Sequence, residues 1–154
     1  MVRMSLSGFK RAAWHFSEKR VPQRKRPSEE KSRETALVVD EANTCRSIAQ
    51  GILQSFDIDA VGVPTPEAAM DLLIRGGVDY YNFILVDFHM TTITGPETAR
   101  RLRLMGVTTK ILGVSLNHTE EKARAFVEAG ADACIGKPLT AESLGNVLQE
   151  LRNM

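Results

Sequence analysis

The sequence predicts a doubly wound α/β domain: a five-stranded parallel sheet with the strand order 2-1-3-4-5 and five helices. From residue 35 onward, five short apolar runs alternate with five longer segments whose apolar residues recur at helical spacing. Strands that alternate with helices are joined by crossovers, which makes the sheet parallel and covers both of its faces. Four of the five runs are followed by a charged or hydroxyl side chain, as expected where parallel strands reach a ligand-binding edge.

The first half of this body predicts two strands and two helices. Residues 35–39 (TALVV) form the first expected strand and residues 58–63 the second. Between them, residues 43–56 carry apolar side chains at positions 48, 49, 52, 53 and 56, which is a helical stripe. Thr65-Pro66-Glu67 predicts the next helix start, because it offers a capping hydroxyl, a proline at the first position and an early acid. We expect that helix to end at Gly76-Gly77.

The second half begins with the segment on which the prediction depends most. Residues 83–86 (FILV) are four large apolar residues in succession, which predicts a strand buried on both faces, and they run directly into Asp87. A helix is expected over 95–105, a strand over 110–115 and a short strand over 133–135. Thr119 and Thr140 are the expected caps of the last two helices. The first of these should end at Gly130, and the second should face inward with its apolar residues at 144, 147, 148 and 151.

Charge separates the chain into a basic tail and an acidic body. Residues 1–34 contain 10 Lys and Arg against 4 acids, whereas residues 35–154 contain 10 against 15. The tail has little periodicity and includes Pro22 and Pro27, so we expect it to be disordered. Its basic clusters fit a nuclear-import patch, an organelle transit peptide or a solvated segment without a receptor, and the sequence does not choose among them.

Composition predicts an intracellular protein that does not enter membranes. No apolar run approaches the roughly 20 residues that span a bilayer, and no secretory signal is visible. Cys45 and Cys134 form no metal or redox motif and are expected to be small core residues. We therefore expect a monomer located in the cytoplasm, the nucleus or both, with no direct binding to nucleic acid.

The side chains at the predicted carboxyl edge indicate a chemistry. Asp40-Glu41 follow the first strand and Asp87 the third, while Ser115 ends the fourth and Lys137 follows the fifth. In the predicted order these four strands are consecutive neighbours, so the side chains should converge. Three crowded carboxylates repel one another unless a cation lies among them, and oxygen ligands suit Mg²⁺. Acids, metal, hydroxyl and lysine together predict phosphoryl transfer to a carboxylate.

These residues resemble the receiver domain of two-component response regulators over about residues 35–153. The resemblance rests on Asp40-Glu41, on Asp87 with His89-Met90 and Gly95, on Ser115 and on Lys137-Pro138. It implies a flavodoxin-like fold. The runs LRLMGV and RAFVEAGAD, followed by KPLT, look most like the stand-alone plant regulators of type C.

The resemblance implies a role for each of these residues. Asp87 would accept a phosphoryl group from a phosphohistidine. Asp40 and Glu41 would hold Mg²⁺ together with Asp87 and the backbone carbonyl of His89. Ser115 would hydrogen-bond the acyl phosphate and Lys137 would pair with it. The peptide bond between Lys137 and Pro138 would be cis.

The resemblance also implies partners. The donor would be a histidine phosphotransfer protein or a histidine kinase, in signalling of the cytokinin type. Without an output domain, the chain would act through a changed surface, or as a phosphate sink whose net effect is that of a phosphohistidine phosphatase. The alternative is a receiver-shaped protein-interaction module that is no longer phosphorylated. A flavin or nucleotide carrier fits less well, because the acidic loop after the first strand repels phosphate.

The sequence departs from the family pattern at four positions. Ser115 replaces the commoner threonine, and Thr91 stands where proline is usual. Cys134 stands where an aromatic ring usually turns inward on activation, so a switch of that kind is in doubt. Leu116 is bulky where the family favours a small residue. We hypothesise that Leu116 narrows the path of water to the phosphoryl group and prolongs the phosphorylated state.

Overall fold

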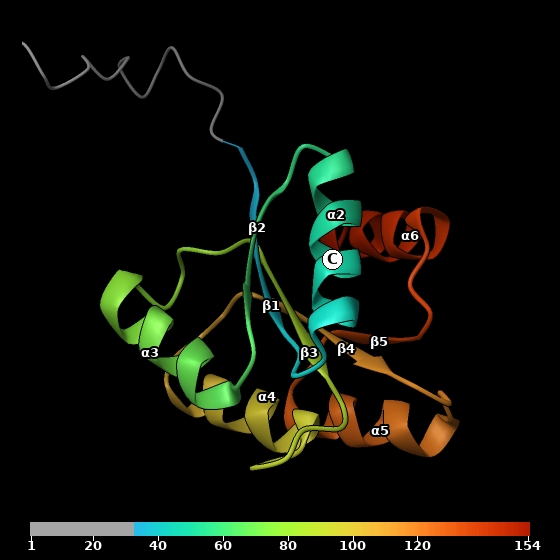
Figure 1. Cartoon of the computed structure of the whole chain (residues 1–154). Helices are drawn as coiled ribbons and strands as arrows, with labels where there is room; N and C mark the ends of the chain where they lie inside the picture. The colour runs from blue at the N-terminus through green and yellow to red at the C-terminus, as the bar shows by residue number, and fades with distance from the viewer. Residues whose placement is uncertain (1–32) are drawn as a thin grey trace, which may run out of the picture. The chain divides into compact units, whose positions relative to one another are not determined.

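The computed structural model describes residues 33–154, which fold into the predicted α/β architecture (Figure 1). One parallel sheet has the order β2-β1-β3-β4-β5, which confirms the predicted doubly wound fold with five strands and five helices. The predictions made for residues 1–32 of the tail lie outside the described residues.

The elements alternate along the chain without exception. The strands are β1 (Thr35–Val39), β2 (Asp59–Val63), β3 (Phe83–Asp87), β4 (Lys110–Ser115) and β5 (Ala133–Gly136). The helices are α2 (Asn43–Ser55), α3 (Pro66–Gly76), α4 (Gly95–Leu104), α5 (Glu120–Ala129) and α6 (Ala141–Arg152). In this part of the chain, no helix has the length and apolar character needed to cross a membrane.

Strand β3 lies at the centre of the sheet and is buried along its whole length, as its apolar run predicts. It pairs with β1 on one side and with β4 on the other, and all the pairings are parallel. The register aligns Val39 with Val86 and Asp87 with Val114. The chain therefore leaves β1, β3 and β4 at the same edge, and the residues that follow these strands are neighbours.

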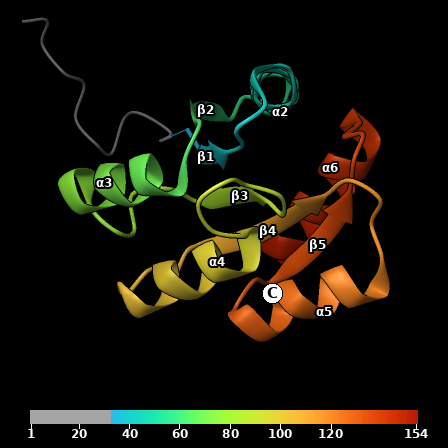
Figure 2. The same ribbon diagram turned by 60° about the horizontal axis from the view of Figure 1, so that its bottom comes forward.

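Two apolar cores separate the sheet from its helices (Figures 1 and 2). Helices α3, α4 and α5 cover one face, while α2 and α6 cover the other. Phe126 of α5 is fully buried in the first core, with its ring against the backbone of Gly113 on β4. A Cβ at position 113 would overlap that ring, so the glycine lets the helix approach the sheet closely.

Threonine side chains cap four of the five helices. Thr65, Thr94, Thr119 and Thr140 each accept a hydrogen bond from the backbone N–H three residues later. The caps predicted at Thr65, Thr119 and Thr140 are confirmed, and Gly130 ends α5 in the left-handed conformation with φ of 112°. Such caps satisfy backbone groups that a helix end otherwise leaves without partners.

Some details of α2 differ from the prediction. The buried line of this helix consists of Ala49 and Leu53, whereas Ile48 and Phe56 of the predicted stripe are exposed. Successive residues of a helix differ by about 100° in direction, so Ile48 falls outside the face that Ala49 buries. Cys45 is also partly exposed, which makes its assignment to the core wrong.

The other differences concern element ends. Helices α2 and α4 each end one residue before the predicted position, β2 begins one residue later and β5 extends to Gly136. These shifts are of the size expected where helices fray and strand pairing ends.

Arg103 joins three parts of the fold through one guanidinium group. It donates hydrogen bonds to the carbonyl oxygens of Gly130 (2.9 Å), Val107 (3.0 Å) and Thr109 (2.7 Å), and its Nη2 lies 2.9 Å from Asp132 Oδ2. The same Asp132 oxygen accepts the N–H of Ile111 at 2.8 Å. The planar fork of arginine can reach all these acceptors at once, which an ammonium cannot do. Arg103 thus ties α4 to the start of β4 and to the turn before β5.

We expect Arg103→Ala to lower the free energy of unfolding by about 2 kcal/mol, because partly buried carbonyls and Asp132 lose charge-assisted hydrogen bonds. Arg103→Lys should recover only a minor part of this loss. Arg101→Ala is the matched control on the same helix, since its pair with Glu97 is partly exposed and should contribute little to stability. Urea unfolding followed by circular dichroism measures all three variants. Equal losses for Arg101→Ala and Arg103→Ala would contradict this assignment.

Candidate functional site

Three charged side chains from different strand ends meet at the carboxyl edge of the sheet. Lys137 Nζ lies 2.8 Å from Asp40 Oδ2 and 3.0 Å from Asp87 Oδ1. The three side chains are each about nine-tenths buried. Asp40 follows β1, Asp87 ends β3 and Lys137 follows β5, so residues up to 97 positions apart form one cluster. The Lys137–Pro138 peptide bond is cis, as the resemblance implied.

Asp40 is held by hydrogen bonds to both its carboxylate and its backbone carbonyl. Its Oδ1 accepts the N–H of Ala42 at 2.9 Å, while Oδ2 faces Lys137. Arg46, one turn into α2, donates to the carbonyl oxygen of Asp40 at 2.7 Å. The carboxylate therefore has a defined direction before any ligand binds.

The cluster is electrostatically unbalanced, because two carboxylates share one ammonium group. Burial raises the pKa of Asp87 above its ordinary value, and the neighbouring charge of Asp40 acts in the same direction, against the hydrogen bond from Lys137. Burial tends to lower the pKa of Lys137, but its hydrogen bonds to Asp40 and Asp87 outweigh this effect and raise it. Lys137 is consequently a permanent cation, and one negative charge is left over.

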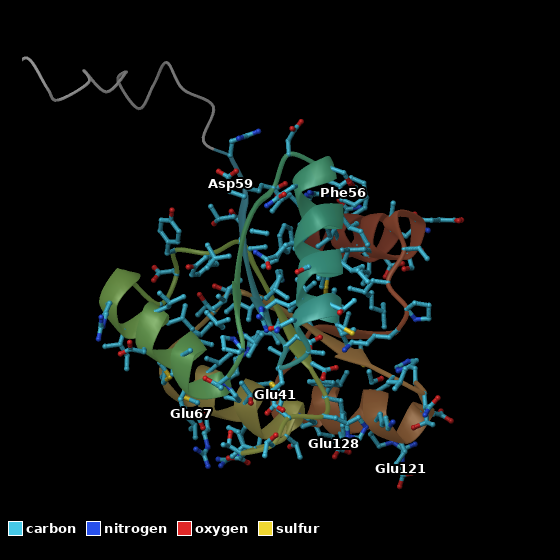
Figure 3. All side chains as sticks on the ribbon, in the orientation of Figure 1. Glu41, Phe56, Asp59, Glu67, Glu121 and Glu128 are labelled. Carbon is cyan, nitrogen blue, oxygen red and sulfur yellow. The ribbon has the colours of Figure 1, made fainter. Side chains whose placement is uncertain are left out.

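Glu41, which is labelled in Figure 3, bonds to the loop after β3. Its carboxylate accepts hydrogen bonds from the backbone N–H of Thr91 and from the Thr91 hydroxyl, the latter at 2.7 Å. These bonds lower the pKa of Glu41, the backbone one most. Of the three carboxylates predicted to crowd together, the structure joins two. Among residues 33–154, no group of three or more His, Cys, Asp or Glu side chains is arranged to hold a metal ion.

The loop after β3 packs tightly against Asp87. Gly95 begins α4 directly over the carbonyl oxygen of Asp87, and a Cβ at position 95 would collide with that oxygen. The N–H of Gly95 donates to the carbonyl of Phe88 at 2.8 Å, which folds the loop back on the strand. His89, whose backbone carbonyl the resemblance implicates, is exposed in this loop, with its ring 4.9 Å edge-on from Phe88.

Ser115 ends β4 fully buried, and its hydroxyl faces an unexpected neighbour. Its Oγ lies 2.9 Å from Nδ1 of His118, and the same nitrogen lies 3.7 Å from Cys134 Sγ. Burial raises the pKa of the Cys134 thiol, and a hydrogen bond with Ser115 acts in the opposite direction. The sequence pattern indicates no role for His118. The spacing of three residues between Ser115 and His118 does not predict their contact, because a loop rather than a helix brings the two side chains together.

The donor set at the edge fits a hard divalent cation. Asp40 and Asp87 offer carboxylate oxygens, they carry more negative charge than Lys137 neutralises, and neither sulfur nor imidazole nitrogen takes part. Mg²⁺ prefers such oxygen ligands and keeps several waters, so two carboxylates and a backbone carbonyl suffice for it. Glu41 would approach this set only by leaving Thr91.

Comparison with known proteins identifies the family to which this chain belongs. A model described as the response regulator receiver domain matches residues 36–149. The chain belongs to this family. It is similar to two-component response regulator 24 of Arabidopsis thaliana, with 35% identity over 125 residues that cover 81% of this chain and 88% of that protein. Two-component response regulator ORR42 of Oryza sativa subsp. japonica is 36% identical over 121 residues, covering 77% and 86%.

More distant relatives agree with this placement. The sensor histidine kinase RcsC of Salmonella typhi matches 112 residues at 28% identity, which is 73% of this chain but 12% of the kinase. Among solved structures, the chemotaxis protein CheY4 of Vibrio cholerae has a TM-score of 0.70 at 23% identity, covering 78% of this chain and 99% of that one. A response regulator receiver domain protein of Methanospirillum hungatei also gives 0.70, at 20% identity, with 79% and 96% covered. At these identities the structures show a shared fold.

We expect Asp87→Asn to increase the free energy of unfolding at pH 7 in a buffer containing a metal chelator. The raised pKa of Asp87 means that its ionised form is disfavoured in the fold, so its stabilising contribution is fully present below about pH 4 and is lost as pH rises through the folded pKa. The neutral amide avoids that loss. The advantage of the variant should therefore shrink as pH falls from 7 to 4.

Denaturant unfolding across this pH range measures the effect. Asp71→Asn is the control, because Asp71 forms an exposed pair with Arg75 on α3 and should change stability little. An Asp87→Asn variant less stable than the wild type at pH 7 would contradict the electrostatic account.

Proposed function

We propose that this receiver domain accepts a phosphoryl group on Asp87 from a phosphohistidine. One observation supports this above the others: the Asp87 carboxylate lies at the carboxyl edge of the central strand with the Lys137 ammonium 3.0 Å from its Oδ1. A buried carboxylate with a raised pKa and a fixed cation beside it is a candidate nucleophile with a partner for developing charge.

The proposed step forms one bond and breaks one. A carboxylate oxygen of Asp87 attacks phosphorus, and the bond between phosphorus and the donor imidazole nitrogen breaks with its electron pair staying on that nitrogen. A proton carried by the other nitrogen of the donor ring makes the leaving group a neutral imidazole. Lys137 neutralises charge on the transferred group, and Asp40 holds Lys137 in position through its 2.8 Å contact. A Mg²⁺ ion held by Asp40, Asp87 and the carbonyl of His89 would supply further charge neutralisation. Ser115 would hydrogen-bond the acyl phosphate.

The donor we propose is a histidine phosphotransfer protein or a histidine kinase. The support is that the chain's relatives are named two-component response regulators, and that a similar segment occurs within a sensor histidine kinase. An acyl phosphate is hydrolysed by water, so repeated transfer and hydrolysis would remove phosphate from the donor. The chain would then act as a phosphate sink, with the net effect of a phosphohistidine phosphatase.

Transfer from a histidine phosphotransfer protein carrying labelled phosphohistidine tests the proposal. We expect label to leave the donor and to appear on the chain when Mg²⁺ is present, and to stay on the donor when EDTA removes the metal. Asp87→Asn should take no label, because the amide cannot form the acyl phosphate. Asp71→Asn should behave like the wild type, which controls for the loss of a surface acid.

Two outcomes would contradict the proposal. If the wild type takes no label from several donors, the chain is better described as an interaction module with a receiver fold. If Asp87→Asn takes as much label as the wild type, the acceptor is another residue.

Hydrolysis of the proposed acyl phosphate should depend on Leu116. Leu116 is 55% exposed and lines an apolar pocket with Ile48 and Pro138, and Lys137 lies in its wall. Because Lys137 would pair with the phosphoryl group, we infer that Leu116 borders the path by which water approaches that group. We expect Leu116→Ala to shorten the lifetime of phosphorylated chain a few-fold, as measured by loss of label after the donor is removed. Leu104→Ala, at an exposed leucine on α4, should leave the lifetime unchanged.

A further inference from the structure

The hydroxyl that is expected to bind the phosphoryl group is already engaged by a histidine. Ser115 is fully buried, and its Oγ lies 2.9 Å from Nδ1 of His118, whereas His118 itself is exposed. When the ring proton is on Nε2, Nδ1 is an acceptor and the Ser115 hydroxyl donates to it. A hydroxyl has one proton to donate, so the same proton cannot also bind a phosphoryl oxygen.

The loop between β4 and α5 is built to return His118 to this position. Asn117 has a φ of 50°, a left-handed conformation that asparagine tolerates better than most residues. The Lys122 ammonium donates to the carbonyl oxygens of Leu116 at 2.8 Å and Asn117 at 3.2 Å, which holds the reversed turn. This turn directs the chain back across the sheet edge instead of straight into α5.

The neighbouring strand leaves room for the histidine. A Cβ at Gly136 of β5 would lie 2.9 Å from His118 Cβ, so a larger residue there would displace the histidine. Two residues earlier on the same strand, Cys134 offers a small side chain 3.7 Å from Nδ1. Gly136, Cys134 and the reversed turn at Asn117 together let an exposed imidazole reach a buried hydroxyl.

We propose that His118 is a positioning residue that holds the Ser115 hydroxyl in the resting state and releases it when a phosphoryl group arrives. This inference rests on the proposed function of Asp87 and adds a competitor for one of its phosphate ligands. The histidine then opposes phosphorylation, because the resting state keeps a hydrogen bond that the phosphorylated state must exchange. Release of His118 also frees the β4–α5 loop. The occupancy of the site is thereby coupled to the surface beside Cys134, which stands where receiver domains usually have an aromatic ring.

The proposed competition between His118 and a phosphoryl group for the Ser115 hydroxyl should change the affinity for a phosphoryl analogue by a measurable amount. A hydrogen bond of this kind contributes a net amount that corresponds to about a five-fold change in an equilibrium constant. Removing the imidazole should therefore tighten binding of a phosphoryl analogue about five-fold, and it should do so only while the Ser115 hydroxyl is present. A general structural effect of the substitution would not depend on Ser115.

Calorimetric titration with fluoroberyllate in the presence of Mg²⁺ provides the test, using the full chain. We expect His118→Ala to bind the analogue about five-fold more tightly than the wild type, and Ser115→Ala to bind it more weakly. In the Ser115→Ala background, the additional His118→Ala change should have no effect. His118→Asn is the matched control, because an amide oxygen can occupy the place of Nδ1, and it should bind with nearly wild-type affinity.

A spectroscopic measurement follows the same bond directly. The ¹⁵N resonance of His118 Nδ1 should shift when fluoroberyllate binds to the wild type, and it should already be shifted in unliganded Ser115→Ala. If the wild type binds fluoroberyllate but His118→Ala binds with unchanged affinity, or if the effect of His118→Ala persists without Ser115, the inference is overturned and the proposed function stands. If the wild type binds no fluoroberyllate at all, both fail.

Discussion

The pairing of one lysine with two carboxylates is the interaction on which the carboxyl edge of this sheet depends. Asp40 and Asp87 are both largely buried and a few ångströms from a common cation, and without Lys137 their repulsion would have to be relieved by protonation or by displacement of a strand end. The pairing leaves one negative charge in excess, which makes the edge receptive to a further cation. The pairing that keeps the folded edge intact therefore also leaves the excess charge on which the proposed function relies.

That cluster exists because β3 is buried on both faces and is paired on both sides. Its register with β1 and β4 determines which residues are neighbours where the strands end, so a shift of one residue would turn Asp87 into the core. Gly95 adds a local condition, since only a residue without a Cβ lets α4 begin against the carbonyl of Asp87. Close packing of α4 thus holds the backbone at the strand end that carries Asp87.

The two faces of the edge are organised differently. On the side of β1, polar contacts are satisfied by the backbone and by neighbouring charges, as in Asp40 with Ala42 and Glu41 with Thr91. On the side of β4 and β5, a hydroxyl, an imidazole and a thiol form a cluster of Ser115, His118 and Cys134. The first side provides charge, and the second provides the hydroxyl whose hydrogen bond the proposed exchange with His118 would break. In that proposal, a rigid acidic site is combined with a loop that responds to its occupancy.

The sequence by itself determined the order of elements, because apolar periodicity and strand order dictate which residues reach one edge, and with it the meeting of Asp40, Asp87 and Lys137. It also determined the helix boundaries that carry clear local signals, at Thr65, Gly76-Gly77, Thr119, Gly130 and Thr140. Only the tertiary structure decided where flexible side chains point once they arrive. Glu41 bonds to Thr91 instead of joining the other acids, Ile48 and Cys45 stay outside the core, and His118 returns to Ser115. Each of these outcomes depends on loop conformation and on space left by distant residues such as Gly136, and neither leaves a periodic signal in the chain.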